Sequence, residues 1–288
     1  MTTVLSSQPP SARWHARFRE RYGPWAVVTG ASDGIGREMA ISLAEAQLNL
    51  VLVARRGVVL EALAAELNQA HGIRTLIIAA DLGMQAGIDA LLASTSALDI
   101  GLLVASAGFG TSGPFIDAPL EAELSMIDVN CRAVAALSHA FGRRFARQHR
   151  GGLVLMSSLV AFQGVPRAAN YAATKAFIQA FAEGLRAELK PLGVDVVASA
   201  PGPVHSGFAA RASMTMSMAV SSRTVARQTL KALGRTGTVR PGWLSKGLEL
   251  ALMFLPRWGR VRMMGVVMAG MTKGHDSASP SLGEVAGR

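Results

Sequence analysis

Short apolar runs alternate along this chain with longer stretches of mixed polarity. The runs are rich in β-branched residues and predict strands at 25–29, 48–54, 73–79, 100–106, 152–158 and 194–200, with a last short one at 238–241. Amphipathic segments such as 57–70 and 173–190 lie between them and predict helices. Strands that are apolar throughout, separated by helices, are typical of a parallel sheet buried on both faces. We therefore predict an α/β fold, a doubly wound parallel sheet of about seven strands.

The ends of the chain extend this predicted domain, which covers residues 25–242. In residues 1–24, Trp14, Phe18 and Tyr22 recur every four residues, which predicts an aromatic stripe on a short helix. Packing on the outside of the domain is favoured over a membrane or partner anchor. The same segment has no apolar run long enough for a secretion signal, so we expect a protein that is not secreted.

The C-terminal segment 243–272 has apolar runs broken by charged residues and Pro256. Neither run reaches the roughly 20 apolar residues that a membrane span needs, and two amphipathic helices joined at Pro256 are predicted instead. Three roles are open to this extension: a cap over the substrate pocket, an oligomer contact, or peripheral membrane contact through 243–271. Residues 273–288 are predicted to form a flexible tail.

Composition narrows the classes of partner. The 288 residues carry a formal net charge of +10, which favours anionic partners such as phosphate-bearing cofactors, acyl carriers or anionic lipid. Nucleic acid is not expected, because no binding motif is visible and aromatic residues make up only 6% of the chain. The single cysteine, Cys131, cannot form an internal disulfide, so a reducing, cytoplasmic location is expected.

A glycine-rich turn follows the first predicted strand. The sequence TGASDGIGRE places Gly30, Gly34 and Gly36 where the backbone must turn tightly and approach a pyrophosphate at the amino end of the next helix. The second strand ends in VARR, with Arg55 and Arg56 where a NAD site carries a carboxylate. Two guanidinium groups suit a ribose 2′-phosphate, so the predicted cofactor is NADP(H).

The stretch NYAATKAF places Tyr171 and Lys175 one helical turn apart, on one face of a helix. Ser158 ends the fifth predicted strand thirteen residues before Tyr171, at the sheet edge where ligands bind. A neighbouring ammonium favours the phenolate and lowers the pKa of a tyrosine, which brings proton transfer within reach. We therefore expect Tyr171 and Lys175 to act together in catalysis.

Taken together, TGASDGIG, the Tyr171/Lys175 pair, Ser158 upstream and PGPVHS after the sixth strand resemble the short-chain dehydrogenase/reductase family. The resemblance implies a Rossmann-like sheet, hydride transfer between a nicotinamide and a carbonyl or alcohol, and a homo-oligomer, a dimer or a tetramer. It assigns four catalytic residues: Asn130, Ser158, Tyr171 and Lys175. Tyr171 would deliver the proton, Ser158 would polarise the substrate oxygen, Lys175 would bind the nicotinamide ribose, and Asn130 would hold a water linked to Lys175.

The same resemblance assigns the cofactor site and no metal. Asp81 corresponds to the adenine contact, Ser206 to the residue that holds the carboxamide, and Val204 to a backbone contact. The full predicted set is Gly30, Ser32, Asp33, Gly34, Ile35, Gly36, Arg55, Arg56, Asp81, Leu82, Ala107, Gly108, Asn130, Tyr171, Lys175, Pro201, Gly202, Val204 and Ser206.

One motif departs from the family. Where many members carry NNAG after the fourth strand, this chain carries ASAG, Ala105 to Gly108, and so lacks the amides that tie strands together and reach the adenosine ribose. Together, Asp33 and the PWAVVTGASDGIG segment resemble the branch of 3-oxoacyl-CoA and 17β-hydroxysteroid reductases, which use NADPH.

The substrate is less constrained by the sequence. The segment 208–220 holds Met214, Met216 and Met218, and Phe109 and Phe162 are expected near the pocket mouth. Thioethers adapt to irregular apolar ligands, so we predict a small lipophilic carbonyl or alcohol substrate, such as a 3-oxoacyl compound, a steroid or another ketone. Two alternatives to an enzyme stay open: a non-catalytic NADP(H)-binding redox sensor and an interfacial membrane protein.

Overall fold

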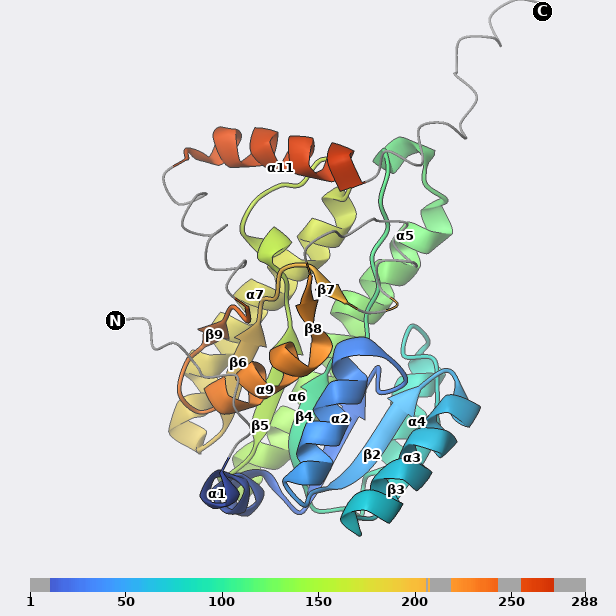
Figure 1. Cartoon of the computed structure of the whole chain (residues 1–288), viewed down its shortest axis with the longest axis vertical. Helices are drawn as coiled ribbons and strands as arrows, with labels where there is room; N and C mark the ends of the chain where they lie inside the picture. Colours follow the sequence, from blue (N-terminus) through green and yellow to red (C-terminus); the bar gives the residue numbers. More distant parts are fainter. Residues whose placement is uncertain (1–10, 206, 208–218, 243–254, 272–288) are drawn as a thin grey trace, which may run out of the picture.

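The computed structural model describes residues 11–205, 207, 219–242 and 255–271 (Figure 1). Seven parallel strands form one sheet in the order β3-β2-β1-β4-β5-β6-β9. The strands are β1 (Trp25–Thr29), β2 (Asn49–Ala54), β3 (Thr75–Ala79), β4 (Ile100–Ala105), β5 (Gly152–Met156), β6 (Asp195–Ser199) and β9 (Thr238–Val239). The predicted α/β class and the seven strands are confirmed, with strand ends that differ from the prediction by one or two residues.

Helices cover both faces of the sheet. The helices that follow the strands are α2 (Gly34–Glu45), α3 (Gly57–His71), α4 (Gln85–Ser94), α6 (Ala133–Gln148), α7 (Ala169–Leu189) and α9 (Ser222–Ala232). Alternate strand residues point to opposite faces, so Val28 packs with α2, α3 and α9 while Val27 packs with α4, α6 and α7. These two buried layers make the strands apolar along their whole length, which is the pattern that predicted them.

The order of the strands reverses at β1, which pairs with β2 on one side and with β4 on the other. In an open parallel sheet, ligands bind beyond the carboxyl ends of the strands at such a switch point. The glycine turn, the ASAG segment and Ser158 follow β1, β4 and β5, so the topology brings all three to this edge.

Shorter elements border the same edge. They are the 3₁₀ turns η1 (Phe115–Asp117) and η3 (Leu159–Phe162), the helix α5 (Leu120–Ile127), the π-helical turn η2 (Asp128–Arg132), and the strand pair β7 (Val204–His205) and β8 (Val220–Ser221). His205, the second residue of β7, is exposed.

An N-terminal helix, α1 (Ala12–Tyr22), packs outside the sheet. Phe18 and Tyr22 are buried in the core layer that contains α2, and Trp14 stacks on Phe18 with ring centres 4.6 Å apart. The Tyr22 hydroxyl donates a hydrogen bond to Asp195 Oδ2 at 2.8 Å. The aromatic stripe therefore faces the domain rather than solvent.

A C-terminal helix, α11 (Arg257–Met271), lies over the carboxyl edge of the sheet (Figure 1). Met264 and Met268 pack in a small apolar cluster with Val165, Ala168 and Ala172. The predicted helix before Pro256 falls on 243–254, outside the described residues. Within the described part of the chain, no helix is long and apolar enough to cross a membrane.

Candidate active site

The glycine turn fits close contact with a ligand. Gly30 has a φ of +68°, and a Cβ there would lie 2.9 Å from the Ala107 backbone, so only glycine is accommodated without strain. A Cβ on Gly36 would collide with the Gly30 carbonyl oxygen. Asp33 caps α2 by accepting a hydrogen bond from the Gly34 N–H at 2.7 Å. The amino end of α2 is thereby held against this turn, where its partial positive charge favours an anion.

Arg55 and Arg56, which follow β2, line a cavity that the glycine turn also lines. The Arg55 side chain is 61% exposed, and its Nη1 lies 4.0 Å from Asp81 Oδ2. Arg56 donates a hydrogen bond from Nη2 to Ser32 Oγ at 3.2 Å, which ties it to the glycine turn. Ala54, the last residue of β2, has no carboxylate to offer beside them. The structure therefore brings the two predicted arginines close to Asp81 and Ser32, which were also predicted for this site.

The ASAG segment is held by a residue that the sequence analysis did not single out. Thr29 Oγ1, at the end of β1, accepts hydrogen bonds from the N–H groups of Ser106 at 3.1 Å and Ala107 at 3.0 Å. One hydroxyl thus ties the ends of β1 and β4, a task assigned above to the absent amides. The role depends on β1 and β4 being neighbours, which the threonine alone does not reveal.

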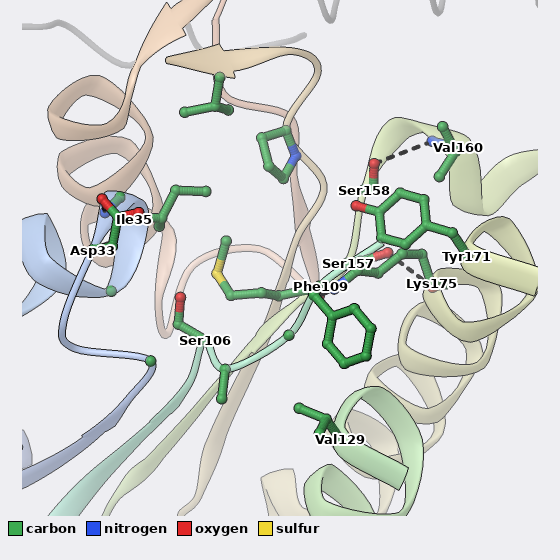
Figure 2. A pocket seen from close by; sticks show the side chains of 18 of the residues that line it. Asp33, Ile35, Ser106, Phe109, Val129, Ser157, Ser158, Val160, Tyr171 and Lys175 are labelled. Atoms are coloured by element: carbon green, nitrogen blue, oxygen red, sulfur yellow. Dashed lines mark hydrogen bonds between the residues drawn. The ribbon is translucent and has the colours of Figure 1, made fainter. Parts of the chain in front are cut away.

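Ser158 and Tyr171 lie side by side in the site (Figure 2). Ser158 follows β5 and caps η3, where its Oγ accepts from the Val160 N–H at 3.4 Å. Tyr171 lies in the first turn of α7, because this helix begins at Ala169 rather than at the predicted residue 173. An amide–carboxylate contact holds this first turn, since Asn170 Nδ2 donates to Glu123 Oε2 at 2.6 Å.

Lys175 lies one turn after Tyr171, as predicted, and is only 7% exposed. Its Nζ is 5.7 Å from the centre of the Tyr171 ring and donates a hydrogen bond to the Met156 carbonyl oxygen at 2.8 Å. Ser157, also missed by the sequence analysis, donates from Oγ to the Lys175 carbonyl oxygen at 3.1 Å. Both contacts fix α7 to the end of β5.

Burial reverses one expectation about this pair. Removal from water raises the pKa of Tyr171 to about 12, and a hydrogen bond with Ser158 opposes this shift without cancelling it. Burial likewise lowers the pKa of Lys175 to about 8, against a weaker opposite effect of Cys131. The expected lowering of the tyrosine pKa is therefore wrong, because burial shifts it in the opposite direction.

Asn130 lies in the π-helical turn η2 and is buried. Its Nδ2 donates to the Phe109 carbonyl oxygen at 2.9 Å and to Thr174 Oγ1 at 3.0 Å, and its Oδ1 accepts from the Phe109 N–H at 3.2 Å. The side chain thus links the segment after β4 to α7. A Cβ on Gly108 would lie 2.8 Å from Asn130 Oδ1 and 3.6 Å from Lys175 Nζ. The absence of a side chain at Gly108 therefore lets Asn130 and Lys175 approach its backbone closely.

One cavity of about 350 Å³ joins these groups. Among the predicted residues, it is lined by Gly30, Ser32, Asp33, Gly34, Ile35, Gly36, Arg55, Arg56, Asp81, Leu82, Ala107, Gly108, Ser158, Tyr171, Lys175, Pro201, Gly202 and Val204. Asn130 acts from behind Phe109, which lines the cavity as expected. Ser206 and the methionines of 208–218 lie outside the described residues.

Phe162 is not among the residues that line the cavity. The Arg240 guanidinium lies 4.4 Å from the centre of the Phe162 ring, and one wall of the cavity comes from residues of α11. These are Met264, Val267, Met268 and Met271. A cap over the substrate pocket is one of the three roles open to this extension, but none of these side chains was predicted, because no sequence motif connects α11 to the catalytic residues.

The residues present fit a dinucleotide with a 2′-phosphate. The glycine turn leaves the space that a pyrophosphate needs, and Arg55 and Arg56 follow the carboxyl end of β2, three strands along the sheet from β5 and the catalytic Ser158. The cavity runs without a break from these arginines to Ser158, Tyr171 and Lys175. Within the described residues, no cluster of side chains suits a metal ion.

Comparison with known proteins identifies the family. The model of the family described as short chain dehydrogenase matches residues 24–217. A 7beta-hydroxysteroid dehydrogenase of Collinsella aerofaciens is 33% identical over 179 residues, which cover 62% of this chain and 68% of that protein. A very-long-chain 3-oxoacyl-CoA reductase of Laccaria bicolor is 32% identical over 184 residues, 62% of this chain and 54% of that protein, so the chain spans about half of its length.

Solved structures agree. One from a study of 7beta-hydroxysteroid dehydrogenase stereoselectivity has a TM-score of 0.80 at 27% identity and covers 86% of this chain and 98% of its own. A short-chain dehydrogenase from Sphingobium yanoikuyae in complex with NADPH has a TM-score of 0.73 at 28% identity, covering 90% of this chain and 98% of its own. The chain belongs to the short chain dehydrogenase family and is an oxidoreductase of that family, as its motifs predicted.

Proposed function

We propose that this protein is an NADP(H)-dependent oxidoreductase that interconverts a carbonyl and a secondary alcohol on a lipophilic substrate. The observation that carries the proposal is the single cavity in which a glycine turn and two arginines lead to Ser158, Tyr171 and Lys175. A protein that only sensed the redox state of a cofactor would need the first part of this cavity but not the second.

The chain provides a binding group for each part of the cofactor. The glycine turn and the amino end of α2 would hold the pyrophosphate, Arg55 and Arg56 the 2′-phosphate, and Asp81 the adenine side. When bound, NADP(H) supplies or accepts the hydride. The relative from Sphingobium yanoikuyae, which was solved with NADPH, supports this choice of cofactor.

The chain's own residues manage the proton. In the reductive direction, Ser158 donates a hydrogen bond to the carbonyl oxygen and Tyr171 transfers its phenolic proton to that oxygen. A pKa of about 12 keeps Tyr171 protonated before the reaction, as a proton donor must be. Lys175, next to the ring, stabilises the phenolate left behind, and its pKa of about 8 lets it exchange protons near neutral pH.

The wall contributed by α11 supports a lipophilic substrate. Met264 and Met268 are each 4% exposed and border the cavity on the side of Tyr171. Flexible thioethers pack against apolar ligands of irregular shape and supply no specific hydrogen bond. The relatives act, by their names, on hydroxysteroids and on very-long-chain 3-oxoacyl-CoA, and we propose substrates from these two classes first.

An NADPH-oxidation screen tests the proposal. The panel would contain steroid ketones, 3-oxoacyl thioesters, simple ketones and aldehydes, each with NADPH and with NADH. The proposal expects turnover of at least one apolar ketone class and little turnover of small polar carbonyl compounds. Tight NADPH binding without turnover of any panel member by the native protein would instead support a cofactor sensor.

A further inference from the structure

Helix α11 has two faces of different character. Its inner face carries Met264 and Met268, which wall the catalytic cavity. Its outer face carries Trp258 and Val266, each 72% exposed, with the exposed Arg262 midway between them. Residues 258, 262 and 266 follow one another at one-turn spacing, so they form one outward stripe. An exposed indole beside an arginine is unusual for a surface that meets only water.

The charge on α11 has one sign. Its sequence, RWGRVRMMGVVMAGM, contains three arginines and no acidic residue. Arg260 turns back to donate a hydrogen bond from Nε to the Leu255 carbonyl oxygen at 2.9 Å, while Arg262 is exposed on the outward stripe and Arg257 is exposed at the amino end of the helix. The helix therefore presents an indole, an aliphatic side chain and one guanidinium group on its outer face, with a second guanidinium group at its amino end.

A second exposed apolar surface lies near α11. Phe115 and Ile116 in η1, with Leu120 and Leu124 in α5, are all exposed. The two regions meet at one loop, because the Gly113 N–H donates to the Arg167 carbonyl oxygen at 2.8 Å and Gly265 of α11 lies against Pro166. Figure 1 shows α11 and the start of α5 at the same end of the molecule.

The acidic residues near this end lie on the other element. Asp117 in η1 and Glu121 in α5 are exposed, whereas the charged residues of α11 are all basic. Any attraction to an anionic partner must therefore come from α11, with η1 and α5 adding apolar contact. This separation makes the basic and the apolar contributions distinguishable by mutation.

We propose that the outer face of α11, with Trp258, Arg262 and Val266, and with Arg257 at its amino end, binds the surface of a bilayer that contains anionic lipid. Tryptophan and arginine suit the headgroup layer, and a chain with a net charge of +10 is attracted to an anionic surface. A second copy of this chain would bring the same arginines face to face, which disfavours self-association through this stripe. Binding would place the methionine-walled cavity next to the bilayer, where lipophilic substrates concentrate.

Vesicle flotation with the full chain tests this surface. The native protein is expected to float with phosphatidylcholine vesicles that contain phosphatidylserine and to stay behind with pure phosphatidylcholine. Each arginine removed near an anionic surface weakens binding roughly fivefold, so Arg257→Gln with Arg262→Gln should weaken it roughly 25-fold. The matched control, Arg147→Gln with Arg235→Gln, removes the same charge from exposed sites on α6 and after α9 and should have little effect.

A fluorescence measurement tests the geometry separately. Addition of anionic vesicles should shift tryptophan emission to the blue in the native protein, and Trp258→Phe should remove most of that shift. Equal loss of flotation in the control pair would show attraction by overall charge alone and overturn the proposal, as would no flotation of the native protein. A change of molecular mass in solution caused by the α11 pair alone would assign the stripe to self-association. NADPH binding by each variant, measured without vesicles, confirms that it is folded and keeps this test independent of the proposed reaction.

Discussion

Lys175 holds its ammonium 5.7 Å from the centre of the Tyr171 ring while donating a hydrogen bond to the Met156 carbonyl oxygen at 2.8 Å. Both side chains are removed from water, and the burial changes their pKa values in opposite directions, to about 12 for the phenol and about 8 for the amine. Each group is thereby moved toward its neutral form. At neutral pH only the shift of the amine costs stability, because the phenol is neutral in both the folded and the unfolded chain.

That cost predicts a pH-dependent gain of stability in Lys175→Met. Between pH 8 and 10.5 the unfolded chain binds a proton at this lysine that the folded chain does not, so the lysine's destabilising effect is complete below pH 8 and disappears as the pH rises to 10.5. The variant should therefore gain about 2 kcal/mol in the free energy of unfolding at pH 7, after allowance for the lost hydrogen bond to Met156. By pH 10.5 the gain should be gone.

Denaturant unfolding without cofactor, from pH 7 to 10.5, measures this difference. The same substitution at the exposed Lys190 is the control. A constant difference between native protein and Lys175→Met across this range would contradict the assigned pKa of the buried amine.

Arg55 should determine the preference for the phosphorylated cofactor. Its side chain is exposed in the cavity beside Asp81, where a 2′-phosphate would replace that carboxylate as its partner. Arg55→Gln should cost about 1.5 to 3 kcal/mol, one to two decades in the dissociation constant for NADPH, and leave that for NADH nearly unchanged. Fluorescence titration with both cofactors measures this, and equal affinity of the native protein for NADPH and NADH would refute the assignment.

The α11 wall should set the preference for apolar substrates. Each methylene buried contributes at most about 0.8 kcal/mol, so kcat/KM should rise up to roughly fourfold per methylene across a homologous ketone series. Met268→Gln keeps the size of the side chain but adds a polar amide to the wall, which should flatten this rise. Met84→Gln, at a methionine that is 63% exposed and far along the chain from α11, is the control. Equal efficiency with short polar and long apolar ketones in the native protein would show that α11 is not a substrate wall.

The sheet was predictable because parallel strands that are covered on both faces appear in the sequence as continuous runs of apolar residues. The Tyr171/Lys175 pair and the glycine turn were predictable because helical spacing and backbone approach restrict which residues can serve there. Arg55 and Arg56 were predicted because the end of the second strand, where a NAD site carries a carboxylate, has none in this chain and is followed by two arginines.

Other features depend on distances that the sequence does not contain. Thr29 holds the ends of β1 and β4 only because these strands are adjacent, and Met264 reaches the cavity from a helix about ninety residues after Tyr171. The predicted direction of the Tyr171 pKa shift was wrong because burial, which the sequence does not measure, raises the pKa more than the hydrogen bond with Ser158 lowers it. Helix α7 begins at Ala169, and Asn170 in its first turn is held by Glu123 from α5, a contact between distant residues that the sequence does not show.

Tyr171→Phe tests the central claim most directly. The substitution removes the one oxygen that delivers the proton and leaves the ring in place, so NADPH should bind with nearly native affinity. The rate of NADPH oxidation with the best ketone of the panel should fall by a factor on the order of 10² to 10⁴, the range expected for loss of a general acid. Measured side by side, retained NADPH binding with this loss of turnover is the predicted result, and near-native turnover by the variant would contradict the account.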